Sequence, residues 1–209
     1  MLADQNQSVD AFLNALAAKQ PTPGGGSVAA LAGALAAAMG EMVLNYSVGK
    51  KSLAPHEAEL KTALAEFARA RGLLIQLMAE DQIAYQALTA ARKLPADSPD
   101  RQKEIDVALV ACIRVPQAMA ATALAILADA DRLVDKVNHF LLSDLAVCCE
   151  LAMATLRCAH YNVRANMPDL TDPNDQSRIE SDAQQMHARA KQLVSRAIGS
   201  IWARHARGS

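Results

Sequence analysis

The chain has 209 residues, enough for one domain with a buried core, and 52% of them are hydrophobic. Lysine and arginine total 21 against 22 aspartates and glutamates, so a formal net charge of -1 gives no whole-chain basic surface for nucleic acid or anionic lipid. Aromatic residues make up only 3%, which favours helices over strands. We expect a single all-α helical-bundle domain over residues 1–209.

The cysteines indicate neither a metal site nor a redox motif. None of the four has CxxC spacing, and the five histidines do not cluster with them. The N-terminal stretch MLADQNQ lacks a cationic region followed by an apolar one, which argues against export. We therefore expect a cytoplasmic protein with reduced thiols and no bound metal.

The first predicted helix is short. Ser8 can cap it, and it should run to Lys19 before the turn at residues 21–23. Its apolar face is expected to comprise Val9, Phe12, Leu13 and Leu16.

A second helix is predicted from about Ser27 to Val48, preceded by three glycines at 24–26. The exposed N–H groups at this turn could hold a carboxylate or a polar heterocycle, although the P-loop Gly-Lys-Ser/Thr set is missing. Small residues recur every seven positions, which predicts close helix packing within the chain or across a dimer interface: Gly26, Gly33, Gly40 and Ser47. The segment 28–44 is mostly alanine and glycine and contains Glu41, so we expect a buried helix rather than a membrane span.

A long third helix is predicted from about His56 to Arg92, and it carries a carboxylate on its apolar face. That face comprises Leu60, Leu64, Phe67, Leu74, Met78, Asp81, Tyr85 and Leu88. Asp81 could serve proton transfer or stabilise a cation, or it could pair with an arginine or cap another helix. The spacing alone leaves these alternatives open.

Three further helices complete the predicted bundle. The fourth should run from about Pro99 to Ala130, with a kink or break at 114–117 caused by Pro116. The fifth should follow Ser143 as N-cap and end near Asn166, and the last should span 176–204. One stripe of the fifth helix carries Asp144, Cys148, Leu151, Thr155, Cys158 and Asn162. Asp144 would by itself be assigned to helix capping.

Several segments together resemble the cyclodeaminase/cyclohydrolase family, which includes the cyclodeaminase domain of formiminotransferase-cyclodeaminase and stand-alone methenyltetrahydrofolate cyclohydrolases. The motifs are PTPGGGSVAALAGALAAAM at 21–39, NYSVGKK at 45–51, EDQIAYQAL at 80–88, the VP step at 115–116, SDLAV at 143–147 and NVRAN at 162–166. They cover nearly the whole chain, whereas the stretch DRLVDKVNHFLL at 131–142 is less typical of the family.

The resemblance implies an all-helical homodimer that acts on folate one-carbon units and needs no metal or other cofactor. The balanced net charge and the composition of segment 28–44 separately predict that neither nucleic acid nor a membrane is a partner. By the matching motifs, the expected acid-base residues are Lys50, Asp81 and Asp144. The expected substrate contacts are Gly24, Gly25, Gly26, Ser27, Tyr85, Asn138 and Asn162.

Three functions remain open at this stage. The first is hydrolysis of 5,10-methenyltetrahydrofolate to 10-formyltetrahydrofolate. The second is cyclodeamination of formiminotetrahydrofolate with release of ammonia. The third is a non-catalytic folate-binding or scaffold dimer, which the joint presence of Lys50, Asp81 and Asp144 disfavours.

Overall fold

The computed structural model describes residues 7–207, and most of the stretch on which the export prediction rests lies outside them. The described part contains α-helices and short 3-10 helices and no strand, which confirms the all-α prediction. The elements in chain order are α1 (Val9–Ala17), α2 (Gly25–Asn45), η1 (Lys51–His56), α3 (Glu57–Arg92), α4 (Arg101–Leu133), η2 (His139–Leu141), α5 (Leu142–Asn166), η3 (Met167–Asp169) and α6 (Pro173–Arg207).

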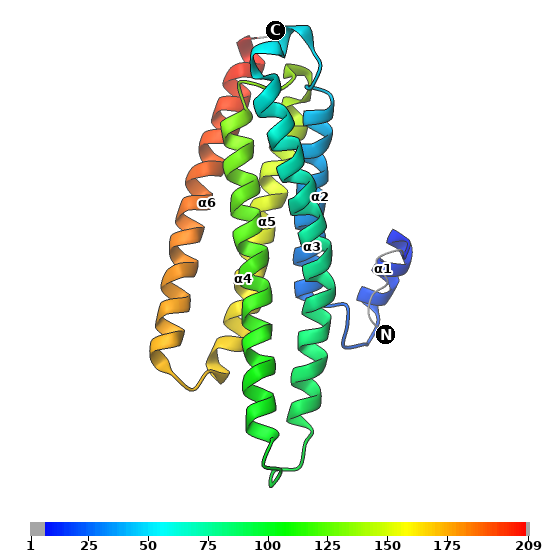
Figure 1. The fold of residues 1–209 in the computed structure, drawn as a ribbon, viewed down its shortest axis with the longest axis vertical. Helices are drawn as coiled ribbons and strands as arrows, with labels where there is room; N and C mark the ends of the chain where they lie inside the picture. The colour runs from blue at the N-terminus through cyan, green and yellow to red at the C-terminus, as the bar shows by residue number, and fades with distance from the viewer. Residues whose placement is uncertain (1–6, 208–209) are drawn as a thin grey trace.

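Helices α2 to α5 form an elongated four-helix bundle (Figure 1). Helix α2 packs against α3 and α5, and α4 packs against the same two helices from the other side. Helix α6 covers α4 and α5 and leans away from the bundle toward its own N-terminal end (Figure 1). Because α2 carries no such cover, its outer face remains exposed, with Val28 37% and Leu35 53% accessible.

The small-residue stripe of α2 packs against helices of the same chain. A Cβ added at Gly33 would lie 2.9 Å from the Thr155 side chain and 3.0 Å from Leu74, and one at Gly40 would lie 2.1 Å from the Phe67 ring. At these separations a larger residue would fit only if the neighbouring side chains moved. The packing prediction is therefore confirmed within the chain, and the stripe does not face a dimer interface.

The structure differs from the predicted helices at three places. Helix α2 begins at Gly25, so two of the three glycines lie in its first turn, with Gly24 as N-cap. Helix α4 continues without a break through Pro116, which is buried among helices that hold it in place. Ser143 lies inside the first turn of α5, whose N-cap is Leu141, because the short helix η2 leads directly into α5.

Helix α1 stands beside the lower half of α2 rather than within the bundle (Figure 1). Ser8 caps it as predicted, accepting a hydrogen bond from the Ala11 N–H. Of its predicted apolar face, Phe12 is buried, whereas Val9 and Leu13 are 76% and 54% exposed. The helical period was correct, but a single bundle surface beside α1 covers only part of that face.

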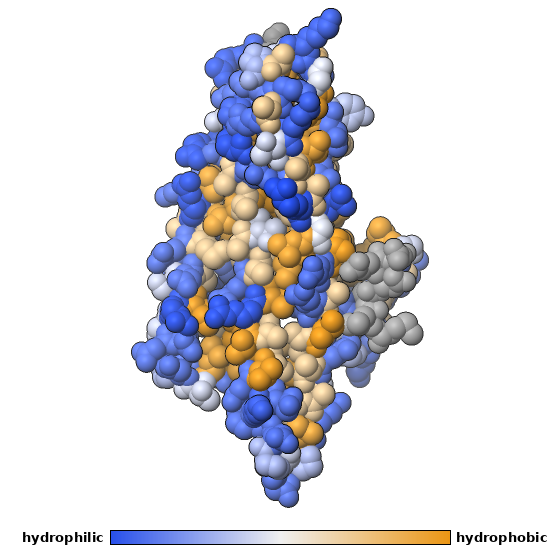
Figure 2. Space-filling view, viewed as in Figure 1, coloured by the Kyte–Doolittle hydropathy of each residue, from blue (hydrophilic) through white to orange (hydrophobic). Residues whose placement is uncertain are grey.

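Three segments are long and apolar enough to cross a membrane by length and composition alone: Gly25–Asn45, Arg101–Leu133 and His139–Asp169. Between 44% and 56% of the most apolar window of each is buried against other helices, so much of this apolar character supplies the bundle core. Figure 2 shows a mixed surface on the viewed face, with hydrophilic side chains at both ends and apolar patches between them.

Candidate active site

A cavity of about 190 Å³ lies at the N-terminal end of α2 and gathers most of the predicted site residues. It is lined from four helices and the preceding turn, by Pro21, Thr22, Gly24, Gly25, Gly26, Asp81, Tyr85, Cys112, Asn162 and Asn166. We call it the glycine cavity. Ser27, the remaining predicted residue of this group, is fully buried beside it and contacts Asp81.

The glycines let α3 approach the start of α2. A Cβ added at Gly26 would lie 2.0 Å from Oδ1 of Asp81, so only glycine leaves room for this carboxylate. At Gly25 the added Cβ would lie 3.3 Å from Oδ1 of Asn162. Because these two glycines have no side chains, an acid from α3 and an amide from α5 lie directly against the backbone of α2.

Asp81 occupies the anion position at the helix start. The Ser27 hydroxyl donates to its Oδ2 at 3.5 Å, and the Ser27 backbone N–H also bonds it. Asp81 therefore accepts a backbone hydrogen bond at the turn where the sequence predicted that an anion could bind. Asp81 thus caps the start of α2, as one of the alternatives predicted. Capping does not prevent the carboxylate from also taking part in chemistry.

The pKa of the Asp81 carboxyl is shifted by its surroundings. Burial raises its pKa above the ordinary value of 3.8, and the two Ser27 hydrogen bonds oppose that rise. No lysine, arginine or histidine among residues 7–207 forms an ion pair with it. A half-buried carboxylate without a paired cation is suited to accept a proton or to stabilise a cationic ligand.

A second cavity, of about 470 Å³, lies at the other end of the bundle and contains Lys50. Its lining is Lys50, Ser52, Leu53, His56, Asp135, Val137, Asn138, His139, Phe140 and Arg204. We call it the lysine cavity. The Lys50 Nζ lies 5.9 Å from the centroid of the Phe140 ring, which is itself 75% exposed. A cation and an exposed aromatic face at this distance can together hold a flat ligand.

Asn138 fixes the loop that forms one wall of the lysine cavity. Its backbone N–H donates to Oγ of Ser47 at 2.9 Å, and its side-chain amide donates to the Tyr46 carbonyl and accepts from the Phe140 N–H, each at 3.4 Å. Both polar ends of the amide thus bond protein groups. In this arrangement Asn138 positions Phe140 and ties the loop to the end of α2.

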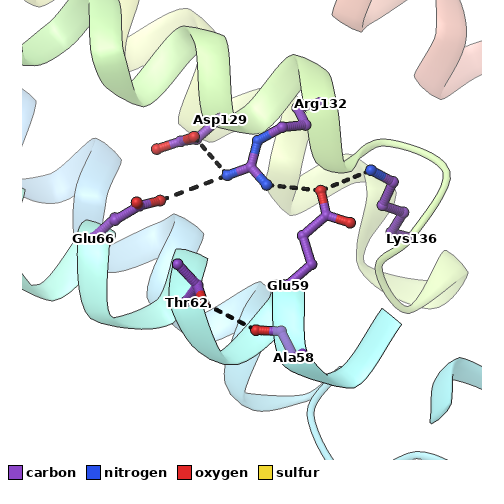
Figure 3. Close-up of polar contacts among 7 residues, drawn as sticks. All are labelled: Ala58, Glu59, Thr62, Glu66, Asp129, Arg132 and Lys136. Carbon is purple, nitrogen blue, oxygen red and sulfur yellow. Dashed lines mark hydrogen bonds and ion pairs between the residues drawn. The ribbon is translucent and has the colours of Figure 1, made fainter. Parts of the chain in front are cut away.

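An ion-pair network joins the start of α3 to the end of α4 and to Lys136 in the loop that follows α4 (Figure 3). Glu59 at the start of α3 accepts from both Arg132 and Lys136 at 2.7 Å, and Arg132 also bonds Asp129. These side chains are 23–38% exposed, so each pair contributes little to stability. Their effect is to hold residues 134–138 in place beside the lysine cavity.

The two cavities are far apart within one chain. Helix α2 has 21 residues, so its ends lie about 30 Å apart. The glycine cavity is at its start, and Lys50 follows its end. Asp144, in the first turn of α5, lies at the Lys50 end of the bundle and lines neither cavity. One copy of the chain therefore does not bring Lys50 or Asp144 to Asp81.

Sequence reasoning missed several cavity residues. Asn166 lies one helical turn after Asn162 and donates to its carbonyl at 2.9 Å, a spacing that could have identified it within NVRAN. Cys112 follows the apolar pattern of α4, so nothing in the sequence marked it. His56, His139 and Arg204 come from three separate elements that only the fold assembles.

Metal binding has no visible basis in the part of the chain that the structure describes. No group of three or more histidine, cysteine, aspartate or glutamate side chains there is placed to hold a metal ion. All four cysteines are free thiols.

Comparisons with known proteins agree on one family. The model of the family described as "Formiminotransferase-cyclodeaminase" matches residues 8–185. A methenyltetrahydrofolate cyclohydrolase of Methylorubrum extorquens is 35% identical over 171 residues, which are 80% of this chain and 82% of that protein. The formimidoyltransferase-cyclodeaminase of Rattus norvegicus is 29% identical over 94% of this chain, and the chain spans only 37% of that protein.

The fold has a close counterpart among solved structures. The crystal structure of a formiminotetrahydrofolate cyclodeaminase from Thermotoga maritima matches with a TM-score of 0.88 over 95% of this chain and 98% of the other. The sequences of the two are 24% identical, so this likeness establishes the fold.

Proposed function

The chain belongs to the formiminotransferase-cyclodeaminase family, and we propose that it hydrolyses 5,10-methenyltetrahydrofolate to 10-formyltetrahydrofolate. The observation that carries the proposal is Asp81, a half-buried carboxylate with no paired cation among the described residues, in a cavity with no other charged side chain in its lining. The cyclohydrolase of Methylorubrum extorquens supports this reaction, because the similarity covers four fifths of both proteins.

Asp81 suits the first step of that reaction. In the substrate, a carbon bridges N5 and N10 of the folate within a delocalised cation. Water adds to this carbon, and Asp81 accepts the proton that the water loses, giving a neutral tetrahedral intermediate. An anionic carboxylate beside the bridge also stabilises the bound cation. Its raised pKa makes Asp81 a stronger base than an exposed aspartate.

The second step needs an acid. The bond from the bridging carbon to N5 breaks, N5 takes up a proton, and the hydroxyl loses its proton to give the formyl group on N10. Over both steps one water is consumed and one proton is released. Lys50 is the proposed proton donor to N5, and Asp144 is proposed to orient the substrate or relay the proton.

Because Lys50 lies about 30 Å from Asp81 in one chain, we propose that the active form is a dimer that pairs opposite ends of two bundles. The exposed outer face of α2 suits this contact: Leu35 is its middle residue and Val28 lies two turns before it. Two α2 helices that cross antiparallel at Leu35 would bring the glycine end of one copy to the lysine end of the other. Each dimer would then hold two composite sites.

Gly26→Ala tests the glycine cavity within this proposal. The new Cβ would overlap Asp81, so the carboxylate must move, and turnover should fall about tenfold or more. Gly72→Ala is the matched control, because an added Cβ there meets nothing within 4 Å and alanine favours helix. The test measures the steady-state rates and melting temperatures of both variants. Equal rates in the two variants would contradict the proposed role of the Asp81 carboxylate at Gly26.

Cyclodeamination is the second candidate. In that reaction N10 attacks the formimino carbon of 5-formiminotetrahydrofolate, the nitrogen that leaves is protonated, and ammonia departs to give the 5,10-methenyl cation. The same carboxylate and lysine could transfer these protons at the same carbon. The rat relative favours this candidate, since its similarity covers 94% of the present chain.

One assay separates the candidates. Purified protein is incubated with 5,10-methenyltetrahydrofolate and, separately, with 5-formiminotetrahydrofolate, while the methenyl absorbance is followed. We expect the absorbance to disappear faster than in buffer in the first incubation. An absorbance that instead appears in the second would establish the cyclodeaminase, and no change in either would favour a non-catalytic folate-binding dimer.

A further inference from the structure

The glycine cavity contains two asparagine side chains whose amino groups are already bonded to the protein. Nδ2 of Asn162 donates to the Cys158 carbonyl at 2.9 Å. Nδ2 of Asn166 donates to the carbonyls of Asn162 at 2.9 Å and Cys112 at 3.4 Å. An amide can bond a carbonyl only through its amino group. The positions of nitrogen and oxygen are therefore determined for both side chains.

Both amide oxygens are available as hydrogen-bond acceptors. Between residues 7 and 207, no group donates to Oδ1 of Asn162 or of Asn166. A Cβ added at Gly25 would lie 3.3 Å from Oδ1 of Asn162, so this oxygen lies at the glycine turn of the cavity. Asn166 lines the same cavity one helical turn, about 6 Å, further along α5. Two acceptors on one wall favour a ligand that carries N–H groups.

The volume of the glycine cavity suits one part of a folate rather than the whole molecule. At about 190 Å³ the cavity is smaller than the roughly 300–1,000 Å³ that hold a complete drug-sized ligand. The part of a folate that carries adjacent N–H groups is the pterin ring, with its 2-amino group and N3–H. On the wall from α3, Asp81 is bonded to Ser27 and faces the bridging carbon in the proposed reaction. The amino edge at the far end of the ring is then left to the two asparagines of α5.

We propose that Asn166, together with Asn162, selects the substrate by accepting hydrogen bonds from the 2-amino group and N3–H of the pterin. This inference rests on the proposed function, since it places a folate in the glycine cavity. The feature recognised is a 2-amino-4-oxo ring, in which N3 carries a hydrogen. A 2,4-diamino ring has a lone pair on N3 instead, and this lone pair would face an amide oxygen. Asn166 is thus a specificity-determining residue and takes no part in proton transfer.

Folic acid and its 4-amino analogue aminopterin test this selection, because they differ only in the 4-oxo or 4-amino group and the hydrogen on N3. Titration calorimetry on the wild type should give a dissociation constant for folic acid at least about tenfold lower than that for aminopterin. Asn166→Asp should reverse this order, because a carboxylate pairs with the protonated diamino ring through two hydrogen bonds. Asn166→Ala should reduce the preference to within about threefold.

The control is Asn174→Asp, which makes the same chemical change at an exposed position in the first turn of α6, outside the glycine cavity. It should keep the wild-type preference. The comparison of the two ligands on the wild type needs no substitution, so it tests the proposal even if a variant fails to fold. Melting temperatures of the variants report their folding.

Several results would overturn the inference. They are equal affinities of the wild type for the two ligands, tighter binding of aminopterin, no binding of folic acid, an unchanged preference in both Asn166 variants, or a lost preference in the control. The measurement depends on binding and not on turnover, so two failures can be told apart. A protein that prefers folic acid but hydrolyses no methenyltetrahydrofolate would refute the proposed reaction alone, and an active protein without the preference would refute this inference alone.

Discussion

Replacing Asp81 with asparagine should lower the turnover of 5,10-methenyltetrahydrofolate by about a hundredfold or more while the fold persists. Asparagine keeps the shape and can still accept the Ser27 hydrogen bond, but it cannot take up a proton or offset the substrate cation. Steady-state kinetics measures the effect. Glu80→Gln removes a neighbouring carboxylate outside the glycine cavity and should leave turnover within about twofold.

The Asp81→Asn substitution should not lower the stability of the protein at neutral pH. The native state raises the pKa of Asp81, so it binds that proton more tightly than the unfolded chain does. The contribution of this group to the free energy of unfolding therefore falls as pH rises from the ordinary value of 3.8 through the native pKa. Asparagine removes this penalty, and its melting temperature at pH 7 should equal or exceed that of the wild type. If the Asp81→Asn variant is as active as the wild type, Asp81 is not an acid-base group of the reaction.

Lys50→Met should reduce turnover to a similar degree, about a hundredfold, because the step that protonates N5 loses its acid. Methionine keeps most of the length and apolar character of the side chain, so packing beside Phe140 is retained. Lys51→Met is the matched control, since it removes an adjacent exposed lysine that lines neither cavity. Equal rates for the two variants, measured at saturating substrate, would contradict the proposed role of Lys50.

Much of the fold could be predicted from local sequence patterns. The long apolar repeat of α3 fixed both ends of that helix within a residue, because its period and its flanking breakers act locally. The break allowed for at Pro116 is absent for the opposite reason: the intrinsic effect of proline on a helix is local, but the packing of α4 between α3 and α5 outweighs it. The start of α2 was misplaced because a glycine as N-cap carries no side-chain signal.

For the candidate site too, local sequence patterns predicted some features, and others depend on the tertiary fold. The carboxylate on the apolar face of α3 was visible from periodicity, and close packing at Gly26 from the heptad spacing, but the contact between the two depends on the tertiary fold. The separation of Lys50 from Asp81 was not visible, because the motifs carry no information about which end of a bundle each one reaches.

Mixing two inactive variants tests the composite active site most directly. Asp81→Asn and Lys50→Met proteins are combined under conditions that allow subunits to exchange, and the methenylfolate hydrolase rate is measured before and after exchange. If each site takes Asp81 from one copy and Lys50 from the other, every mixed dimer holds one intact site, and random exchange should restore about a quarter of wild-type activity. Exchange that is complete by mass spectrometry, with a rate no higher than the mean of the two parents, would contradict the composite site.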